Sequence, residues 1–169
     1  MQRFMGKVVL VTGAGSGIGK ASALRLAAEG GSIFCVDLNR EAVESAAAEI
    51  TAEGGVATPW VCDVGNEASV QEAVGACIEG YGSLYGVVNM AGILRFDDTE
   101  ELQTDDWQKV IDINLTGSMV LGRAAPPDLV ETKGSIVNAA STAALSGLPC
   151  GLAYSASKGG VLAMTRSIA

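Results

Sequence analysis

The 169-residue chain contains no histidine. This absence excludes a Ser-His-Asp triad, a Cys-His pair and any metal site that needs an imidazole ligand, and we expect no metal centre. Basic residues are also scarce, because 11 Lys and Arg stand against 19 Asp and Glu, for a net charge of −8. Nucleic acids and anionic membranes attract proteins through basic patches, so we expect neither as a partner.

Cysteines are few, and long apolar runs are missing. None of the four cysteines stands in CxxC spacing; they are Cys35, Cys62, Cys77 and Cys150. This usage predicts reduced thiols in or near the core of a cytoplasmic protein. The first residues lack the pattern of a signal peptide, and the apolar run after them is short and followed by glycines. We therefore expect no membrane-spanning segment.

Apolar runs alternate with helical patterns five times along the chain. The predicted strands cover residues 7–12, 32–37, 57–62, 85–89 and 134–138. The predicted helices cover residues 17–29, 40–52, 67–80, 104–125 and 152–169. Pro126 and Pro127 are expected to end the fourth helix in a turn. The alternation predicts one α/β domain over residues 1–169, a doubly wound parallel sheet within a three-layer α/β/α fold.

A glycine-rich turn follows the first predicted strand. Apolar residues 8–11 lead into Thr12, and glycines then occupy positions 13, 15, 17 and 19 before a helix rich in Ala and Leu. Strand, turn and helix in this order are the context of a dinucleotide site, because glycines let backbone N–H groups approach a pyrophosphate at the helix N-terminus. A merely flexible loop is the alternative, which the clear strand and helix on either side disfavour.

Asp37 ends the second predicted strand, 18 residues after Gly19. A carboxylate near this offset binds the 2′-hydroxyl of the adenosine ribose and repels a 2′-phosphate, so Asp37 predicts NAD(H) over NADP(H). Leu38 and Asn39 come next, and the nearest following cation is Arg40. The alternative role is a carboxylate at the start of the next helix, and one residue can fill both roles.

Tyr154 and Lys158 stand four residues apart, and Ser141 precedes the tyrosine by 13 residues. On a helix, the tyrosine and the lysine share a face, where an ammonium favours the phenolate and lets a tyrosine act as acid or base near neutral pH. A nearby serine hydroxyl can hold an alcohol or carbonyl oxygen. Alone, the pattern also fits a helix start with a packed tyrosine and an exposed lysine, but its combination with the glycine turn favours catalysis.

These motifs together resemble the short-chain dehydrogenase/reductase (SDR) family. Residues 12–19 are similar to its TGxxxGxG turn, and residues 89–92 to its NNAG segment, with Met90 in the second asparagine position. The pair that usually contacts adenine in the family corresponds to Asp63 and Val64. The family's catalytic asparagine, serine, tyrosine and lysine correspond to Asn114, Ser141, Tyr154 and Lys158. Order and spacing agree along the whole chain.

The resemblance implies a Rossmann-fold, NAD(H)-dependent oxidoreductase that interconverts a small secondary alcohol and a ketone, working as a homodimer or homotetramer. Tyr154 would then move the hydroxyl proton, and Lys158 would favour the phenolate and hold the nicotinamide ribose. Ser141 would orient the substrate oxygen, and Asn114 would support a water that relays protons to the lysine. The cofactor-binding residues implied are Gly13, Ser16, Gly17, Ile18, Gly19, Asp37, Leu38, Asp63, Val64, Asn89, Ala91, Gly92, Tyr154 and Lys158.

In the family, two further strands and a substrate loop follow the helix that carries the tyrosine. We therefore expect five of the family's seven strands, in the order 3-2-1-4-5, without the C-terminal strands and the substrate loop. A non-catalytic dinucleotide-binding or oligomerising fragment is the alternative, and cofactor binding without turnover would favour it. Leu94, Ala143 and Leu148 suggest an apolar wall for the substrate, with plain loop packing as an equal alternative.

Overall fold

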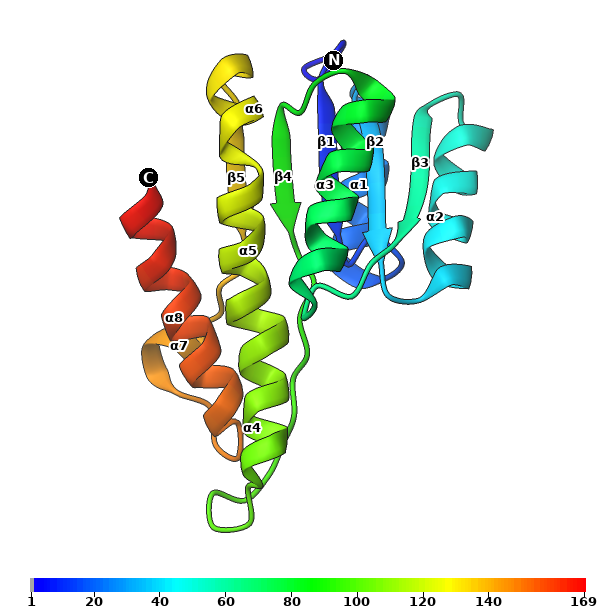
Figure 1. Ribbon diagram of the computed structural model, residues 1–169. Coiled ribbons are helices and arrows are strands. Elements are labelled where there is room, and N and C mark those ends of the chain that lie inside the picture. Colours follow the sequence, from blue (N-terminus) through cyan, green and yellow to red (C-terminus); the bar gives the residue numbers. More distant parts are fainter. Residues whose placement is uncertain (1) are drawn as a thin grey trace.

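One parallel sheet of five strands forms the centre of the computed structural model, which describes residues 2–169 (Figure 1). Its strands, in chain order, are β1 (Val8–Thr12), β2 (Ser32–Asp37), β3 (Val56–Val61), β4 (Gly86–Asn89) and β5 (Ser135–Asn138). The order across the sheet is β3-β2-β1-β4-β5, and each neighbouring pair is parallel. The predicted strand order is therefore confirmed, with β3 and β5 at the two edges.

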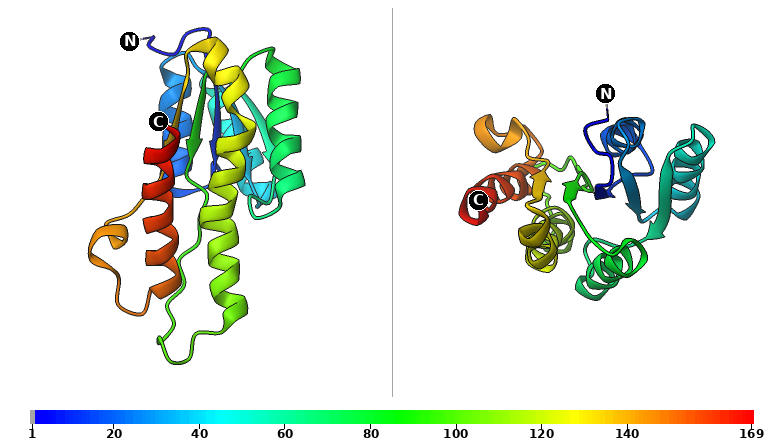
Figure 2. Two further views of the ribbon diagram at one scale, coloured as in Figure 1. Left: turned by 60° about the vertical axis from the view of Figure 1, so that its left-hand side comes forward. Right: turned by 90° about the horizontal axis from the view of Figure 1, so that it is seen from above.

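Helices cover both faces of the sheet, as the view from above shows (Figure 2). They are α1 (Gly17–Ala28), α2 (Arg40–Ala52), α3 (Glu67–Tyr81), α4 (Thr104–Ile111), the π-helix η1 (Asp112–Thr116), α5 (Gly117–Ala124), α6 (Pro126–Thr132), α7 (Ala143–Ser146) and α8 (Leu152–Ile168). Helices α1 and α2 pack on one face, α3 and α5 on the other, and α8 lies along α4, η1 and α5. This arrangement confirms the doubly wound three-layer fold.

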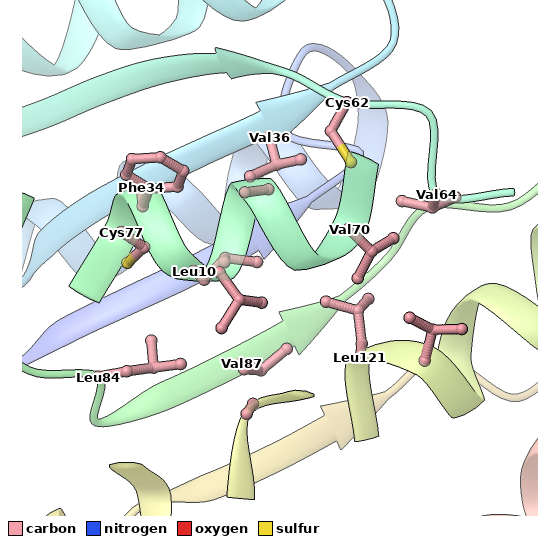
Figure 3. Packing of buried hydrophobic residues seen from close by; sticks show 14 of the residues in the cluster. Leu10, Phe34, Val36, Cys62, Val64, Val70, Cys77, Leu84, Val87 and Leu121 are labelled. Carbon is pink, nitrogen blue, oxygen red and sulfur yellow. The ribbon is translucent and has the colours of Figure 1, made fainter. Parts of the chain in front are cut away.

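The central strand β1 is buried on both faces, which is why its sequence is continuously apolar. Because side chains alternate along a strand, Val8 and Leu10 enter the cluster under α3 and α5, whereas Val9 and Val11 enter the cluster under α1 and α2. Figure 3 shows the first cluster, in which Leu10 lies among side chains of the neighbouring strands and helices. Because this strand is buried, the glycine turn that follows it has a fixed position at the end of the sheet.

The predicted helix over residues 104–125 is broken into three parts. A π-helical turn, η1, interrupts it around Asn114, and α5 ends at Ala124. The sequence pattern predicted one continuous helix here and missed this turn. The expected break at Pro126 is real, but the two prolines begin a new helix, α6, in the first-turn position that tolerates a missing N–H.

Ion pairs between side chains hold the N-terminal segment against the end of α1. Arg3 and Arg25 both donate to the carboxylate of Glu29, whose side chain is 7% exposed. These hydrogen bonds, that from Arg3 foremost, lower the pKa of Glu29 to about 2. A carboxylate whose pKa is lower in the folded than in the unfolded protein stabilises the fold at any pH above its unfolded pKa, here 4.5. This stabilisation is lost as the pH falls toward the folded pKa of about 2.

We accordingly expect Glu29→Gln to lower the melting temperature above pH 5 and to approach the wild type as the pH falls toward 2. Thermal denaturation of both proteins between pH 2 and pH 7 checks this, at roughly one-unit steps. Glu44→Gln is the matched control, because Glu44 pairs with Arg40 at the surface and exposed pairs contribute little. A gap between wild type and Glu29→Gln that stayed constant with pH would contradict the assignment.

Candidate active site

A cleft of about 490 Å³ opens beyond the carboxyl ends of the strands. The strands point toward the part of the molecule where α8 begins and α7 lies (Figure 1). Most of the predicted site residues line this cleft: Gly13, Ser16, Gly17, Ile18, Gly19, Asp37, Leu38, Asp63, Val64, Ala91, Gly92, Tyr154 and Lys158. Ligands of open parallel sheets bind at this edge, so the fold brings the two motifs of the sequence to a single site.

The glycine turn is packed too tightly for other residues at its end. A Cβ on Gly19 would overlap the carbonyl oxygen of Gly13, so helix α1 could not begin this close to β1. Ser16, the residue before α1, makes no capping bond with its side chain. The first N–H groups of the helix thus remain free to bind an anion in the cleft.

Asp37 joins the turn to the second strand. Its Oδ2 accepts a hydrogen bond from the backbone N–H of Gly15 at 2.9 Å, and its Oδ1 accepts one from that of Asn39 at 3.0 Å. The N-cap of α2 is Asn39, whose side chain accepts from the N–H of Ala42. The alternative role at the helix start therefore falls to Asn39, and Asp37 lies on the cleft wall beside the turn.

Asp63 and Val64 follow β3 and line the same end of the cleft. The carboxylate of Asp63 accepts from the N–H of Gly65 at 2.9 Å, which fixes the chain as it leaves the sheet. Cys62 contributes to this wall as well, and burial raises the pKa of its thiol. A thiol held in its neutral form is inert, so Cys62 shapes the wall rather than reacting.

The cysteine expectations hold for three of the four thiols. Cys35, Cys62 and Cys77 are buried, and burial raises the pKa of Cys35 and of Cys77 to about 12. The expectation was wrong for Cys150, which is exposed. Cys150 lies in the loop before α8, where its Sγ donates to Asp98 at 3.4 Å. A hydrogen bond to this carboxylate raises the pKa of the Cys150 thiol.

Tyr154 and Lys158 reach the cleft from the first turns of α8. Lys158 bonds Ala139, which follows the edge strand β5, whereas Asp37 ends β2 on the other side of β1, so the two groups lie at opposite ends of the cleft. Lys158 is 5% exposed, its Nζ donates to the carbonyl oxygen of Ala139 at 2.7 Å, and it lies 5.8 Å from the centre of the Tyr154 ring. Burial lowers the pKa of the lysine. A Cβ on Gly92 would come within 3.4 Å of this Nζ, so the glycine leaves room for the ammonium.

Asn89 and Asn114 lie behind the cleft wall and are 4% and 0% exposed. The side-chain oxygen of Asn114 accepts from the N–H of Ile93 at 2.8 Å, and its amide donates to the carbonyl of Ile93 at 2.9 Å. Asn114 thereby holds the loop after β4 in place through its carboxamide. The structure places both asparagines as supports of the wall rather than as parts of it.

Ser141 is outside the set of residues that line the cleft. Its Oγ accepts a hydrogen bond from the N–H of Ala143 at 3.1 Å, at the start of α7. Among the three residues suggested for an apolar wall, Leu94 lines the cleft, Ala143 is buried, and Leu148 packs against Gly151. Leu148 therefore has a packing role in its loop, whereas Leu94 is part of the cleft wall.

Sequence reasoning missed the role of Thr12. Its hydroxyl accepts from the N–H groups of Met90 and Ala91, both at 3.1 Å, and donates to Asn89 at 2.8 Å, so it ties β1 to the segment after β4. The polar residue at the end of an apolar strand was the available signal. Also missed were the further lining residues Cys62, Met90, Ile93, Ile113, Ala139 and Ala140.

Two wider features of residues 2–169 bear on the site. No helix in this range is both long and apolar enough to cross a membrane. Over the same residues, the structure brings together no group of three or more Cys, Asp or Glu side chains that could hold a metal ion.

Comparisons with known proteins agree with this geometry. The family model described as short chain dehydrogenase matches residues 7–169. D-threitol dehydrogenase of Mycolicibacterium smegmatis is 42% identical over 168 residues, which are 99% of this chain and 65% of that protein. The 3beta-hydroxysteroid dehydrogenase of Mediterraneibacter gnavus is 40% identical over 170 residues, all of this chain and 62% of that protein.

Among solved structures, NAD⁺-bound xylitol dehydrogenase superimposes with a TM-score of 0.93 at 40% identity, over 98% of this chain and 64% of that one. The chain therefore spans just under two thirds of the length of these relatives. The site agrees with these comparisons, because one cleft holds both the glycine turn and the Tyr-Lys pair. Since the family model matches nearly the whole chain and the relatives are about 40% identical, the protein belongs to the short chain dehydrogenase family.

Proposed function

We propose that the protein is an NAD(H)-dependent oxidoreductase that interconverts a secondary alcohol and a ketone. One observation carries the proposal: a single cleft is lined at one end by the glycine turn and Asp37, and at the other by Tyr154 and Lys158. The first end suits an adenosine pyrophosphate, and the second offers an acid/base group. The named activities of the relatives, on threitol, a hydroxysteroid and xylitol, support an alcohol as the substrate class.

The donors of the site fit the dinucleotide that the family implies. The free N–H groups at the start of α1 would hold the pyrophosphate, Asp37 the adenosine ribose, and Asp63 with Val64 the adenine. When bound, the nicotinamide supplies or accepts the hydride. Lys158 would hold the nicotinamide ribose through its ammonium, which already reaches the cleft with a single backbone partner, Ala139.

In this proposal, Tyr154 carries the proton. For alcohol oxidation, the phenolate accepts the hydroxyl proton as the hydride leaves the carbinol carbon, and for reduction the phenol returns it. The nearby Lys158 ammonium stabilises the phenolate by its charge. Ser141 would orient the substrate oxygen, and its hydroxyl keeps its proton for this, since it accepts from the N–H of Ala143. Asn114 acts from behind the wall, where it fixes the loop around Ile93.

Asp37 is expected to make NADH bind about tenfold more tightly than NADPH, because its carboxylate would meet the 2′-phosphate of the latter at a partly exposed site. Fluorescence titration of both cofactors at low salt measures the ratio. Asp37→Ala should narrow the gap, and Asp63→Ala, which removes a carboxylate from the same cleft wall, should leave the ratio unchanged. Equal or tighter binding of NADPH by the wild type would overturn the NAD(H) assignment.

A second candidate is a dinucleotide-binding module without catalytic activity. The position of Ser141 favours it, because this residue is outside the cleft wall. A panel of sugar alcohols, cyclic alcohols and hydroxysteroids, assayed with NAD⁺ by absorbance at the NADH band, separates the two. Tight NADH binding without turnover of any of them, or of the matching ketones, would favour the module.

Three further expectations remain proposals. We infer a single domain, because the central β1 supplies both apolar clusters and the sheet is continuous from β3 to β5. We also propose a cytoplasmic location, supported by three buried free thiols, and a homo-oligomer, the assembly that the family resemblance implies. Chromatography with light scattering tests the last of these.

A further inference from the structure

We propose that Ser118 is a positioning residue that couples the dinucleotide turn to the helix carrying Tyr154 and Lys158. The inference rests on the proposed dinucleotide site but not on turnover. Ser118 lies on α5, is 4% exposed, and is outside the cleft wall. Its hydroxyl accepts from the amide of Asn89 at 2.7 Å and donates to the backbone carbonyl of Asn114 at 2.7 Å.

These two bonds are the middle of a longer chain of buried hydrogen bonds. On the side of the glycine turn, the hydroxyl of Thr12 donates to Asn89 at 2.8 Å. On the side of α8, the amide of Asn114 donates to the hydroxyl of Ser157 at 3.0 Å, and that hydroxyl donates to the carbonyl of Tyr154 at 2.7 Å. The contacts therefore lead from the residue before Gly13 to the backbone of the tyrosine in two hydrogen-bonded stretches, which Asn114 joins covalently, since one ends on its backbone carbonyl and the other begins at its side-chain amide.

All links of this chain point in one direction, and the direction is forced. Thr12 already accepts from two backbone N–H groups, so its one proton goes to Asn89. That fixes the oxygen of Asn89 toward Thr12 and its NH₂ toward Ser118. Ser118 must then give its proton to the backbone carbonyl of Asn114. The side-chain amide of the same residue is fixed separately, by both backbone groups of Ile93. Within each of the two stretches, hydrogen bonds aligned in this way polarise one another.

A serine on a helix often bonds the carbonyl four residues earlier with no wider consequence. Ser118 differs because it also accepts the amide of Asn89, which comes from the sheet. It is also placed directly after the π-helical turn η1, where it occupies the carbonyl of Asn114. The side chain thus connects three elements, β4, η1 and α5, and α8 packs against the last two of them.

The coupling predicts that a ligand at the glycine turn orders α8 without touching it. ADP is a suitable probe, because it carries adenosine and pyrophosphate but no nicotinamide half, and so fills only the end of the cleft opposite Tyr154 and Lys158. Hydrogen–deuterium exchange, read on peptides that cover residues 152–160, reports the order of the start of α8. In the wild type we expect saturating ADP to slow this exchange by about fivefold, the lower range of coupling between sites.

Ser118→Ala should bind ADP with an affinity within about threefold of the wild type, because Ser118 touches no part of the cleft, and should lose most of the ADP-induced protection of α8. Ser118→Thr retains the hydroxyl and can still bond the carbonyl four residues back, so it should restore the protection. Thr132→Val is the matched control: it removes a half-buried hydroxyl that bonds the carbonyls of Leu84 and Asp128, away from the chain. It should keep the wild-type response.

Ser157→Ala breaks a second link, between Asn114 and Tyr154, and carries the same test if Ser118→Ala does not fold. Full ADP protection of α8 in either folded variant would overturn the coupling, as would ADP binding to the wild type with no change in the exchange of α8. Failure of the wild type to bind either ADP or NADH would instead overturn the proposed dinucleotide site, and the coupling with it.

Discussion

Tyr154→Phe is expected to lower kcat by about 100-fold or more and to leave NADH binding nearly unchanged, because general acid/base catalysis contributes on this scale. The substitution keeps the ring, which lines the cleft, and removes only the hydroxyl. Steady-state kinetics on an alcohol identified in the substrate panel measure kcat, and fluorescence titration measures the affinity for NADH. Wild-type turnover in this variant would show that another group moves the proton.

Lys158→Met is the informative partner of this variant. Methionine fills a similar volume without the charge, so the variant loses both the stabilisation of the phenolate and the contact proposed for the nicotinamide ribose. Both kcat and NADH affinity should fall, whereas Tyr154→Phe should affect kcat alone. Lys109→Met is the control, since Lys109 lies near the end of α4 and outside the cleft wall. Comparing the changes in kcat and in NADH affinity between the two variants separates the role in proton transfer from the role in cofactor binding.

Much of the fold followed from local patterns in the sequence. The bounds of β2 and α2 match the predicted ranges, because a run of buried apolar residues and an amphipathic helix with a clear N-cap leave little choice. The strand order also matched, but through the family resemblance, since no local pattern determines which strands are neighbours. Errors occurred at ends, as at β3, which begins at Val56 instead of residue 57.

What the sequence could not reveal depends on contacts between distant segments. The π-helical turn η1 and the direction of the Asn114 side chain follow from the loop after β4, which packs against them from 21 residues away. The same is true of Thr12, whose partners Met90 and Ala91 are 78 and 79 residues away. The motif residues were recognisable by spacing, but whether each faces the cleft or supports it from behind was decided by tertiary packing.

Asn114 shows the energetic weight of such a supporting residue. It is 0% exposed, and its carboxamide makes three hydrogen bonds: it accepts from the N–H of Ile93 and donates to the carbonyl of Ile93 and the hydroxyl of Ser157. Asn114→Asp has nearly the same shape but replaces the donating NH₂ with an oxygen. At neutral pH, an anionic oxygen would then face the carbonyl of Ile93 in a dry environment, with both former acceptors left unpaired.

We therefore expect Asn114→Asp to cost about 3 kcal/mol of folding free energy at pH 7, from two broken buried hydrogen bonds, and to lower the melting temperature by roughly 10 °C. Burial would raise the pKa of the new carboxyl, so its neutral form, which can donate to Ile93 again, is favoured in the folded state. The stability of the variant relative to the wild type is then greatest below the unfolded pKa of about 3.9 and is lost as the pH rises through the folded pKa.

Asn39→Asp is the matched control, since an N-cap accepts Asp as readily as Asn. Thermal denaturation of the three proteins from about pH 4 to pH 8 should show a gap that widens with pH for Asn114→Asp alone. A small gap that does not change with pH would mean that this amide is not part of the buried network.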